Sequence, residues 1–314
     1  MNSEMEYLDL GNGGPRVSRF CMGGCPMGGY GWGEVSEKEE IDSVHAALDH
    51  GVNFFDTADT YGLGQSERTL GKALGGRRGD VIIETKFGVR AGNGKTFYDN
   101  SPAYIRSALE KSLKNLGTDW VDVYTIHYRD ETPIGDVVDT LCRLREEGKV
   151  RFFGLSNLHG EEIRDYRDHA GYFTCIQDEF SLACRKNEQD LLQAKEILGV
   201  TPMTWGSLGQ GILSGKYNRE STFGADDRRS RDIYVNFHGE KLEQNLKIVE
   251  VLRQIAADHG VTPAACAIRF ILDWLNPSVV LAGIKHVYEM ENNLAAFGWH
   301  LSREEMERLN SISL

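Results

Sequence analysis

Short runs of β-branched residues alternate with helix-like stretches along the whole chain of 314 residues. Runs such as Val81–Ile83 are continuously apolar, as expected for parallel strands that are buried on both faces. Strands that alternate with helices are typical of a parallel sheet covered by helices. We predict eight strands, at residues 17–22, 52–56, 81–85, 121–126, 151–155, 174–177, 201–205 and 278–282.

The segments between these strands carry helical periodicity and helix-end signals. Ser101-Pro102 and Thr132-Pro133 each place a capping residue before a proline, which is typical of a helix start. Two helical stretches, 240–259 and 262–275, precede the eighth strand, which is one helix more than simple alternation requires. We predict helices at residues 36–50, 66–74, 102–116, 134–147, 160–170, 240–259, 262–275 and 302–311.

Two α/β architectures fit this alternation, a (β/α)8 barrel and an open doubly wound sheet. The open sheet normally carries G-x-G-x-x-G in its first turn, and residues 23–33 are rich in glycine but off that pattern. We therefore predict a (β/α)8 TIM barrel that forms a single domain over residues 1–314, with extra helices.

Three segments depart from the simple alternation. Residues 4–16 are expected to form a β-hairpin that caps the barrel bottom, with residues 11–14 as its turn. Residues 88–101 and 206–238 are expected to be polar loops after the third and seventh strands. Loops of this length are unusual unless they are functional or disordered.

Composition and charge favour a cytoplasmic, enzyme-sized protein. The formal charge is −12 with scattered acidic residues, so the basic footprint of a nucleic-acid-binding protein is missing. No apolar run approaches the ~18 residues of a membrane span, and the N-terminus lacks the order of a signal peptide. The six cysteines match no metal-binding spacing, so we expect reduced thiols and no metal. Monomer and homo-oligomer remain open.

Chemically active residue types stand at the ends of three successive predicted strands. Asp56, Lys86 and His127 end the second, third and fourth strands, and Tyr61 follows Asp56 in the next loop. Because the active site of such barrels lies at the C-terminal ends of the strands, these four side chains are expected to converge.

The four side chains suit the delivery of a proton. A free tyrosine, with a pKa of about 10, is a poor acid near neutral pH. We expect the Lys86 ammonium to lower the pKa of Tyr61, Asp56 to hold Lys86, and His127 to orient the substrate oxygen or relay the proton. Taken singly, each residue is more often structural, and Lys86 would also suit a Schiff-base lyase.

Four segments of the sequence resemble the signature blocks of aldo-keto reductases. They are residues 55–62 (FDTADTYG), 85–88 (TKFG), 126–127 (IH) and 154–157 (GLSN), and the resemblance runs over about residues 5–310. It implies a (β/α)8 barrel that binds NADP(H), less often NAD(H), without a Rossmann domain. It also implies reduction of aldehydes and ketones by a tetrad, here Asp56, Tyr61, Lys86 and His127, with Tyr61 as general acid and His127 orienting the carbonyl.

The same resemblance implies a set of cofactor contacts. Ser156, Asn157 and Gln177 match the residues that bind the nicotinamide carboxamide, and Trp205 matches the aromatic residue that stacks on the ring. Backbone amides approach phosphate oxygens only where side chains are small or absent, as in a glycine-rich loop. The remaining matches are Gly23 and Gly24 after strand one, Gly206, Ser207, Leu208, Gln210 and Gly211 in the pyrophosphate loop, and Gly283, Ile284, Lys285, Glu289 and Asn293 at the adenosine phosphate.

Two of these positions give opposite indications about the cofactor. Lys285 would pair with a 2′-phosphate, whereas a carboxylate at Glu289 would repel it. We expect NADPH, with NADH as the open alternative.

We therefore expect an NADPH-dependent reductase of a small-molecule carbonyl compound whose identity is not readable. Bulky, sugar-like or polycyclic carbonyls fit as well as small aldehydes, and the expected walls of the substrate site are Tyr30, Trp32, Phe87 and Tyr128. The alternatives are an NAD-dependent sugar or alcohol dehydrogenase of the same fold, the lyase, and a cofactor-sensing regulatory subunit.

Overall fold

The chain folds into a closed barrel of parallel strands, seen in a computed structural model that describes residues 4–29, 31–33, 35–92 and 95–314. Neighbouring strands around the barrel follow the order β10-β11-β12-β3-β4-β5-β8-β9. This confirms the predicted (β/α)8 barrel. The barrel strands are β3 (Phe20–Gly23), β4 (Phe54–Asp56), β5 (Ile82–Phe87), β8 (Val121–Ile126), β9 (Val150–Ser156), β10 (Phe173–Glu179), β11 (Thr201–Trp205) and β12 (Val279–Gly283).

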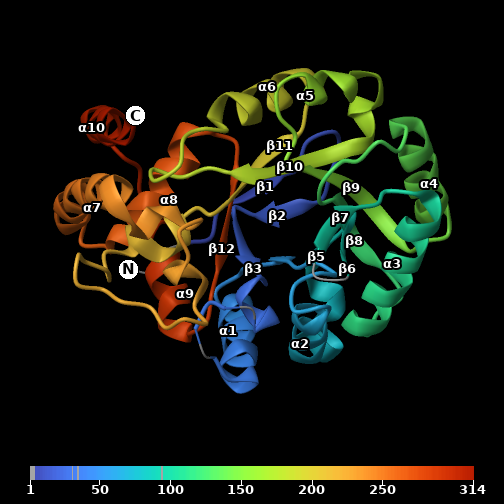
Figure 1. Cartoon of the computed structure of the whole chain (residues 1–314), viewed down its shortest axis with the longest axis horizontal. Coiled ribbons are helices and arrows are strands. Elements are labelled where there is room, and N and C mark those ends of the chain that lie inside the picture. Colours follow the sequence, from blue (N-terminus) through green and yellow to red (C-terminus); the bar gives the residue numbers. More distant parts are fainter. Residues whose placement is uncertain (1–3, 30, 34, 93–94) are drawn as a thin grey trace.

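Helices surround the barrel on its outside (Figure 1). The predicted helix at 160–170 is instead a short α-helix followed by a 3-10 turn that contains Gly171, a residue that weakens helices. The helices are α1 (Glu37–Asp49), α2 (Gln65–Leu74), α3 (Pro102–Leu116), α4 (Ile134–Glu146), α5 (Glu161–Asp165), α6 (Glu188–Leu198), α7 (Gly239–His259), α8 (Pro263–Trp274), α9 (Val287–Leu294) and α10 (Arg303–Ser313).

The helix starts agree with the capping signals in part. At α3 the Ser101 hydroxyl accepts a hydrogen bond from the Tyr104 backbone N–H, with a proline at the first turn. At α4 the cap position is Pro133, which has no side-chain donor or acceptor, while the Thr132 hydroxyl donates to Asp130 at 3.1 Å. The prediction that Thr132 caps this helix was therefore wrong.

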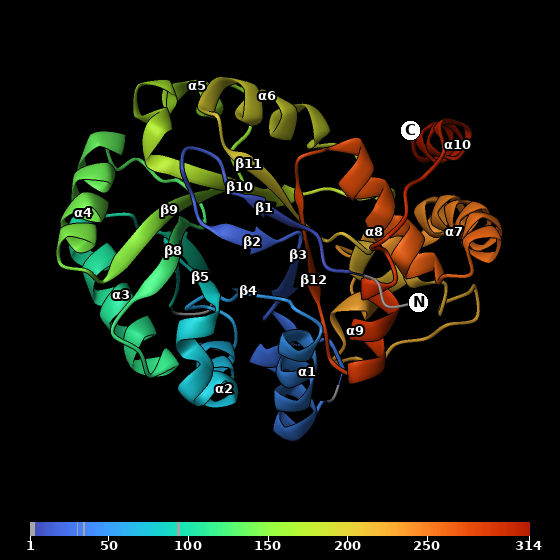
Figure 2. The ribbon, with the colours of Figure 1, turned by 180° about the vertical axis from the view of Figure 1, so that it is seen from behind.

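An antiparallel hairpin of β1 (Tyr7–Asp9) and β2 (Arg16–Ser18) covers the end of the barrel where the strands begin, as predicted (Figure 2). Its residues Leu10 and Val17 belong to the apolar cluster inside the barrel, together with Phe54 and Met203. The predicted first strand therefore divides, because its first residues pair in the hairpin and its later residues form β3.

At the opposite end, two long connections rise above the barrel. Residues 88–101, predicted as a loop, contain a second hairpin of β6 (Val89–Gly92) and β7 (Lys95–Tyr98). Residues 206–238 follow β11 as predicted and contain only short 3-10 turns. The 3-10 turns of the chain are η1 (Pro26–Gly28), η2 (Gly75–Asp80), η3 (Arg167–Tyr172), η4 (Gly209–Ser214), η5 (Arg228–Ser230) and η6 (Val235–Phe237).

The described part of the chain contains no single helix with the length and apolar character of a membrane span. The pair α7 and α8 meets the length and composition criteria only when the two helices are joined across a bend of 93°. All six cysteines are free thiols.

Candidate active site

A cavity of about 1100 Å³ opens at the C-terminal end of the barrel. It brings together most of the residues singled out by the sequence, although they come from all parts of the chain. The predicted residues that line it are Gly23, Trp32, Tyr61, Lys86, His127, Tyr128, Ser156, Asn157, Gln177, Trp205, Gly206, Ser207, Leu208, Gln210, Gly211, Gly283, Lys285, Glu289 and Asn293.

Three predicted contact residues lie elsewhere, and Tyr30 falls outside the described residues. Phe87 follows Lys86 on β5, so its side chain points outward, where it packs against Tyr124 with ring centroids 4.5 Å apart. Ile284 is fully buried in the core between the barrel and the helices. Phe87 therefore does not form a wall of the cavity as predicted, and Ile284 does not line it either, so a cofactor contact of Ile284 stays a prediction.

Gly24, the third of these residues, is used for packing inside the protein. Its N–H donates to the Asp56 carbonyl at 2.7 Å, and its own carbonyl accepts from the Ser66 hydroxyl at 2.8 Å. Both backbone groups of Gly24 thus have partners within the protein. A Cβ at this position would lie 2.5 Å from the Ser66 oxygen, which explains the glycine.

The tetrad residues form a connected chain. The Lys86 ammonium donates to Asp56 Oδ1, to the Thr57 carbonyl at 3.0 Å and to the Tyr61 hydroxyl at 3.3 Å. Asp56 and Lys86 are each 1% exposed, and Asp56 lies below the cavity rather than on its wall. The Tyr61 and His127 rings meet edge to face with centroids 6.1 Å apart.

Burial and charge oppose one another at Lys86 and Tyr61. Burial favours the neutral amine, but the neighbouring acidic groups, Asp56 first and then Tyr61 and Glu84, outweigh it and raise the pKa of Lys86. Burial also raises the pKa of Tyr61, and the nearby Lys86 only partly offsets this effect. The expectation that Lys86 lowers the pKa of Tyr61 holds for its own contribution, but the net direction is the opposite.

His127 is held as a neutral imidazole. Burial and the nearby Lys86 charge lower the pKa of His127 to about 3, so the ring carries one N–H donor near neutral pH. Its backbone carbonyl accepts from the Asn157 amide at 3.0 Å, which ties the end of β8 to the end of β9.

A second carboxyl group, which was not predicted from the sequence, lies next to the tetrad. Glu84 lies beside Asp56 in the β4–β5 register and is 0% exposed. A charged residue inside an apolar strand run, two positions before Lys86 and so on the same face, was the signal that could have identified it.

Next to the tetrad, polar groups suited to a carboxamide gather at the ends of β9 and β10. The Asn157 amide donates to Ser156 Oγ at 2.8 Å, and the Gln177 amide donates to Asp56 Oδ1 at 2.9 Å. These bonds fix the positions of the Asn157 and Gln177 amide nitrogens. Trp205, at the end of β11, lines the same cavity.

The cavity continues along a loop whose backbone requires glycine. Gly206, Gly209 and Gly211 have φ values of 64°, 56° and 101°, in the left-handed region that side chains disfavour. Gln210 lies between them at a φ of 55°, and its side chain turns toward Glu179, with the two polar atoms 3.4 Å apart. Such a loop can present backbone N–H groups to phosphate oxygens.

Cations gather around Glu289 at the far end of the cavity. Glu289 accepts hydrogen bonds from Lys216 Nζ at 3.0 Å and from the Lys285 backbone N–H at 3.0 Å. The Lys285 ammonium donates to the Trp32 carbonyl at 2.8 Å. The carboxylate that was expected to repel a 2′-phosphate therefore already has cationic and N–H partners.

Arg229, which was not predicted from the sequence, adds a further cation to this end of the cavity. It pairs with Asp227 at 2.5 Å and, with Lys285 and Lys216, lines the cavity. Arg229 lies in a segment of mostly charged residues, 226–232 (DDRRSRD), but the fold of the long loop that carries it could not be predicted from the sequence. The donors and cations at this end fit a phosphorylated adenosine.

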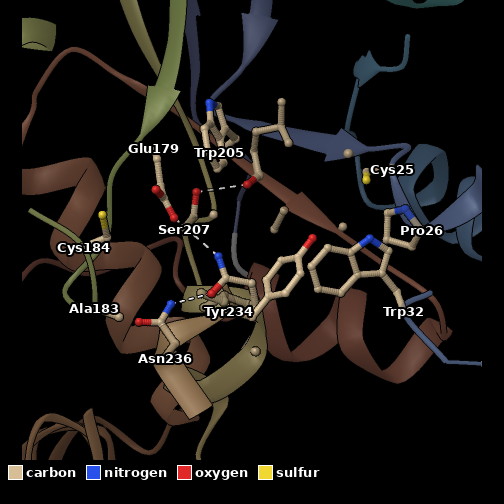
Figure 3. A pocket seen from close by; sticks show the side chains of 18 of the residues that line it. Cys25, Pro26, Trp32, Glu179, Ala183, Cys184, Trp205, Ser207, Tyr234 and Asn236 are labelled. Atoms are coloured by element: carbon tan, nitrogen blue, oxygen red, sulfur yellow. Dashed lines mark hydrogen bonds between the residues drawn. The ribbon is translucent and has the colours of Figure 1, made fainter. Parts of the chain in front are cut away.

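Aromatic rings form the walls near the tetrad. Trp32 and Tyr234 meet edge to face at 5.6 Å, and Figure 3 shows them side by side with Cys25 beyond Trp32. On another wall Tyr128 stacks between His127 and Tyr98, at 5.3 Å and 4.9 Å. Cys25 and Tyr234 were not predicted, since the loops that bring them here have no periodic pattern.

Over the described residues, no group of three or more His, Cys, Asp or Glu side chains is arranged to hold a metal ion.

Comparison with known proteins places these features in one family. The model of the Aldo/keto reductase family matches residues 19–314. The chain is 34% identical over 312 residues to aldo-keto reductase YhdN of Bacillus subtilis, covering 98% of this chain and 93% of that protein. It is 31% identical to probable aldo-keto reductase 1 of Glycine max, with coverages of 98% and 88%.

Solved structures give the same result. The glycerol dehydrogenase AKR11B4 from Gluconobacter oxydans superposes with a TM-score of 0.87 at 32% identity, covering 98% of this chain and 94% of that one. The holo form of aldo-keto reductase AKR11C1 from Bacillus halodurans gives 0.78 at 25% identity, with coverages of 98% and 96%.

Proposed function

The chain belongs to the aldo-keto reductase family of NAD(P)-dependent oxidoreductases, and from that premise we propose that it reduces an aldehyde or ketone with NADPH, using Tyr61 as the general acid. The observation that carries the proposal is the connected set of Asp56, Lys86 and Tyr61 beside the neutral His127.

Each residue of the set has a separate part in the reaction. A bound reduced nicotinamide supplies the hydride. Tyr61 donates its phenolic proton to the carbonyl oxygen as negative charge develops there, and the Lys86 ammonium at 3.3 Å stabilises the resulting phenolate. Asp56 keeps Lys86 charged and in place, and the N–H of the neutral His127 ring orients the oxygen.

The polar groups along the cavity support binding of NADP(H). Ser156, Asn157 and Gln177 would hold the carboxamide, and Trp205 offers an aromatic face for the ring. The loop 206–211 would receive the pyrophosphate through backbone N–H groups. Lys285 and Arg229 would bind the 2′-phosphate, and this favours NADPH over NADH.

The state of Lys86 argues against a Schiff-base lyase. A nucleophilic lysine needs a lowered pKa, so that a neutral amine is present near neutral pH. The pKa of Lys86 is raised instead, because Asp56 and other negative charges outweigh the cost of burial. This lysine is suited to stabilise a neighbouring anion and not to attack a carbonyl carbon.

The proposal is tested by replacing Tyr61 with phenylalanine. Removal of the acid is expected to lower kcat for NADPH-dependent carbonyl reduction by about 10²–10⁴-fold. Binding of NADPH, followed by its fluorescence, is expected to stay within about threefold, because the phenol hydroxyl contacts Lys86 and not the phosphates. Undiminished turnover over a panel of aldehydes and ketones would exclude Tyr61 as the acid.

Oxidation of an alcohol is the second candidate. It is favoured by the likeness to the solved structure of a glycerol dehydrogenase. The same residues serve this direction, with the Tyr61 phenolate accepting the alcohol proton. Comparing kcat/KM for polyols with NADP⁺ or NAD⁺ against carbonyls with NADPH separates the two candidates.

A further inference from the structure

Glu84 is a buried carboxyl group that the proposed mechanism does not use. It lies on β5 two residues before Lys86, so both side chains point into the barrel. Its Oε1 accepts a hydrogen bond from the Thr125 hydroxyl at 2.5 Å, and its Oε2 is buried without a hydrogen-bond partner. A full negative charge at this position would therefore be poorly satisfied.

Groups from several strands face Glu84. Asp56 on β4 and Lys86 on β5 interact with it electrostatically, and the Gln177 amide on β10 stabilises its charged form. The thiols of Cys21 on β3 and Cys175 on β10 also face it, and burial keeps both thiols protonated by raising their pKa well above the usual value.

The other inward-facing residues near Glu84 are small or apolar. Gly154 on β9 leaves space for the Thr125 hydroxyl, because a Cβ there would lie 2.2 Å from Thr125 Oγ1. The inward residues of the next strands, Met203 on β11 and Leu281 on β12, belong to the apolar cluster. Lys86 is thus the cation that Glu84 and Asp56 share.

We propose that Glu84 is a positioning residue that acts through Lys86 and gives the reaction its pH dependence. As a neutral carboxylic acid, Glu84 leaves the Lys86 ammonium facing one carboxylate, so Lys86 stabilises the Tyr61 phenolate strongly. As a carboxylate, Glu84 adds a second negative charge next to Lys86 and weakens that stabilisation. The proposal rests on the proposed function of Tyr61.

The ionisation of Glu84 falls in the physiological range. Burial, followed by the Asp56 charge, raises the pKa of Glu84 to about 7, against the opposing effects of Lys86, Thr125 and Gln177. Tyr61 and His127 have pKa values displaced far from neutrality, in opposite directions. Asp59 and Glu40 also have pKa values raised to about 7, but Asp59 bonds to the Tyr104 hydroxyl and Glu40 lies on α1. Of these groups, Glu84 is the one that interacts with Lys86, so the pH dependence of turnover near neutral pH is assigned to it.

The decisive experiment compares pH profiles of wild-type protein and Glu84→Gln, which keeps the shape without the charge. First-turnover rates at saturating carbonyl and NADPH are measured, so that product release does not hide the proton transfer. The wild-type rate is expected to fall about tenfold from about pH 5.5 to about pH 8.5, a change equal to one unit in the pKa of Tyr61. The Glu84→Gln rate is expected to stay level.

A matched control and a second variant complete the test. Glu40 on α1 also has a pKa raised to about 7, by burial and Glu37, so Glu40→Gln should keep the wild-type profile. Thr125→Val removes the hydrogen bond that favours the carboxylate and should move the midpoint to higher pH. A Glu84→Gln profile equal to wild type, or an unmoved midpoint in Thr125→Val, would overturn the proposal.

Infrared spectroscopy tests the charge of Glu84 without turnover. The carbonyl stretch of a protonated carboxylic acid, isolated as the difference between wild type and Glu84→Gln, should be present at about pH 5.5 and disappear through about pH 7. Its absence at all pH values would contradict the proposed state of Glu84. Wild-type protein that reduces no carbonyl would contradict the proposed function instead.

Discussion

The Lys86 ammonium has three N–H donors, and the structure provides a partner for each. Asp56, the Thr57 carbonyl and the Tyr61 hydroxyl occupy three directions around the nitrogen. Burial of an ion costs several kcal/mol, and a complete set of partners is what offsets such a cost. Because two of the partners are held by the barrel, the third bond aims the charge at the Tyr61 oxygen.

At the other end of the cavity, Lys285 is expected to contribute to the preference for NADPH over NADH. Replacing Lys285 with methionine removes the cation but keeps the length of the chain. A charge-assisted hydrogen bond contributes about 1.5–3 kcal/mol, so NADPH affinity should fall about 10–100-fold. NADH lacks the 2′-phosphate, and its affinity should change by less than about threefold. Fluorescence titration of both cofactors measures the difference.

Replacing Glu289 should have the opposite effect on NADPH affinity from replacing Lys285. Its carboxylate accepts from Lys216 and from the Lys285 backbone N–H, and these partners lower the pKa of Glu289 despite its burial. The neutral variant Glu289→Gln should strengthen NADPH binding, because Lys216 is released toward the phosphate.

The Lys285→Met variant has an outcome that would contradict its prediction. If it lowers the affinities for NADPH and NADH equally, Lys285 acts through its bond to the Trp32 carbonyl and not on a phosphate.

Among the elements, the strands were the part of the site that the sequence predicted best. Their apolar runs end in Asp56, Lys86 and His127, and a barrel brings such strand ends to one face. The two-residue alternation of a strand explains both a success and an error. Lys86 points into the barrel, and Phe87, the next residue, must point away from it.

The elements outside the barrel were less predictable. The β6–β7 hairpin contains the exposed residues Lys95–Tyr98 and lacks the alternation that a half-buried strand shows. The positions of Arg229 and Tyr234 depend on how the long loop 206–238 folds across the barrel. The spacing of Glu84 and Lys86 was a local signal of a shared face, but the position of Glu84 beside Asp56 depends on the pairing of β4 with β5.

The N-terminal hairpin is expected to contribute to stability and not to chemistry. Leu10 is 2% exposed and fills the end of the barrel opposite the cavity. Leu10→Ala should lower the free energy of unfolding by about 2–5 kcal/mol, the range found for leucine deletions in cores. Urea unfolding measures the loss, and Leu314→Ala, at a position 81% exposed, is the matched control. A folded Leu10→Ala protein without turnover would contradict this division of roles.

At the scale of the whole molecule, the two ends of the chain are joined to close the barrel. β3 pairs with β12, and Arg19 next to β3 donates to the Ser278 carbonyl at 3.2 Å and the Leu272 carbonyl at 2.8 Å. Glu6 binds both Arg19 and Arg269 at 2.8 Å. These contacts support our proposal that residues 1–314 form one domain.

Buried carboxyl groups connect the stability of this domain to pH. Asp59 is 6% exposed, and burial, only partly offset by a hydrogen bond from the Tyr104 hydroxyl at 3.0 Å, raises the pKa of Asp59 to about 7. A raised pKa means that the folded state holds the proton more tightly than the unfolded state. The stability from this group is complete below about pH 4 and is lost as pH rises to about 7.

The Asp59→Asn variant isolates this effect, because an amide does not titrate. His127, whose pKa is lowered to about 3, makes stability rise with pH below about 6.5, but it does so equally in both proteins and cancels from their difference. A shift of about three pKa units corresponds to about 4 kcal/mol. Relative to Asp59→Asn, wild type should therefore lose up to about 4 kcal/mol of unfolding free energy between about pH 4 and pH 7.5. Urea unfolding at a series of pH values measures this difference, and a pH-independent difference would show that Asp59 is ionised throughout.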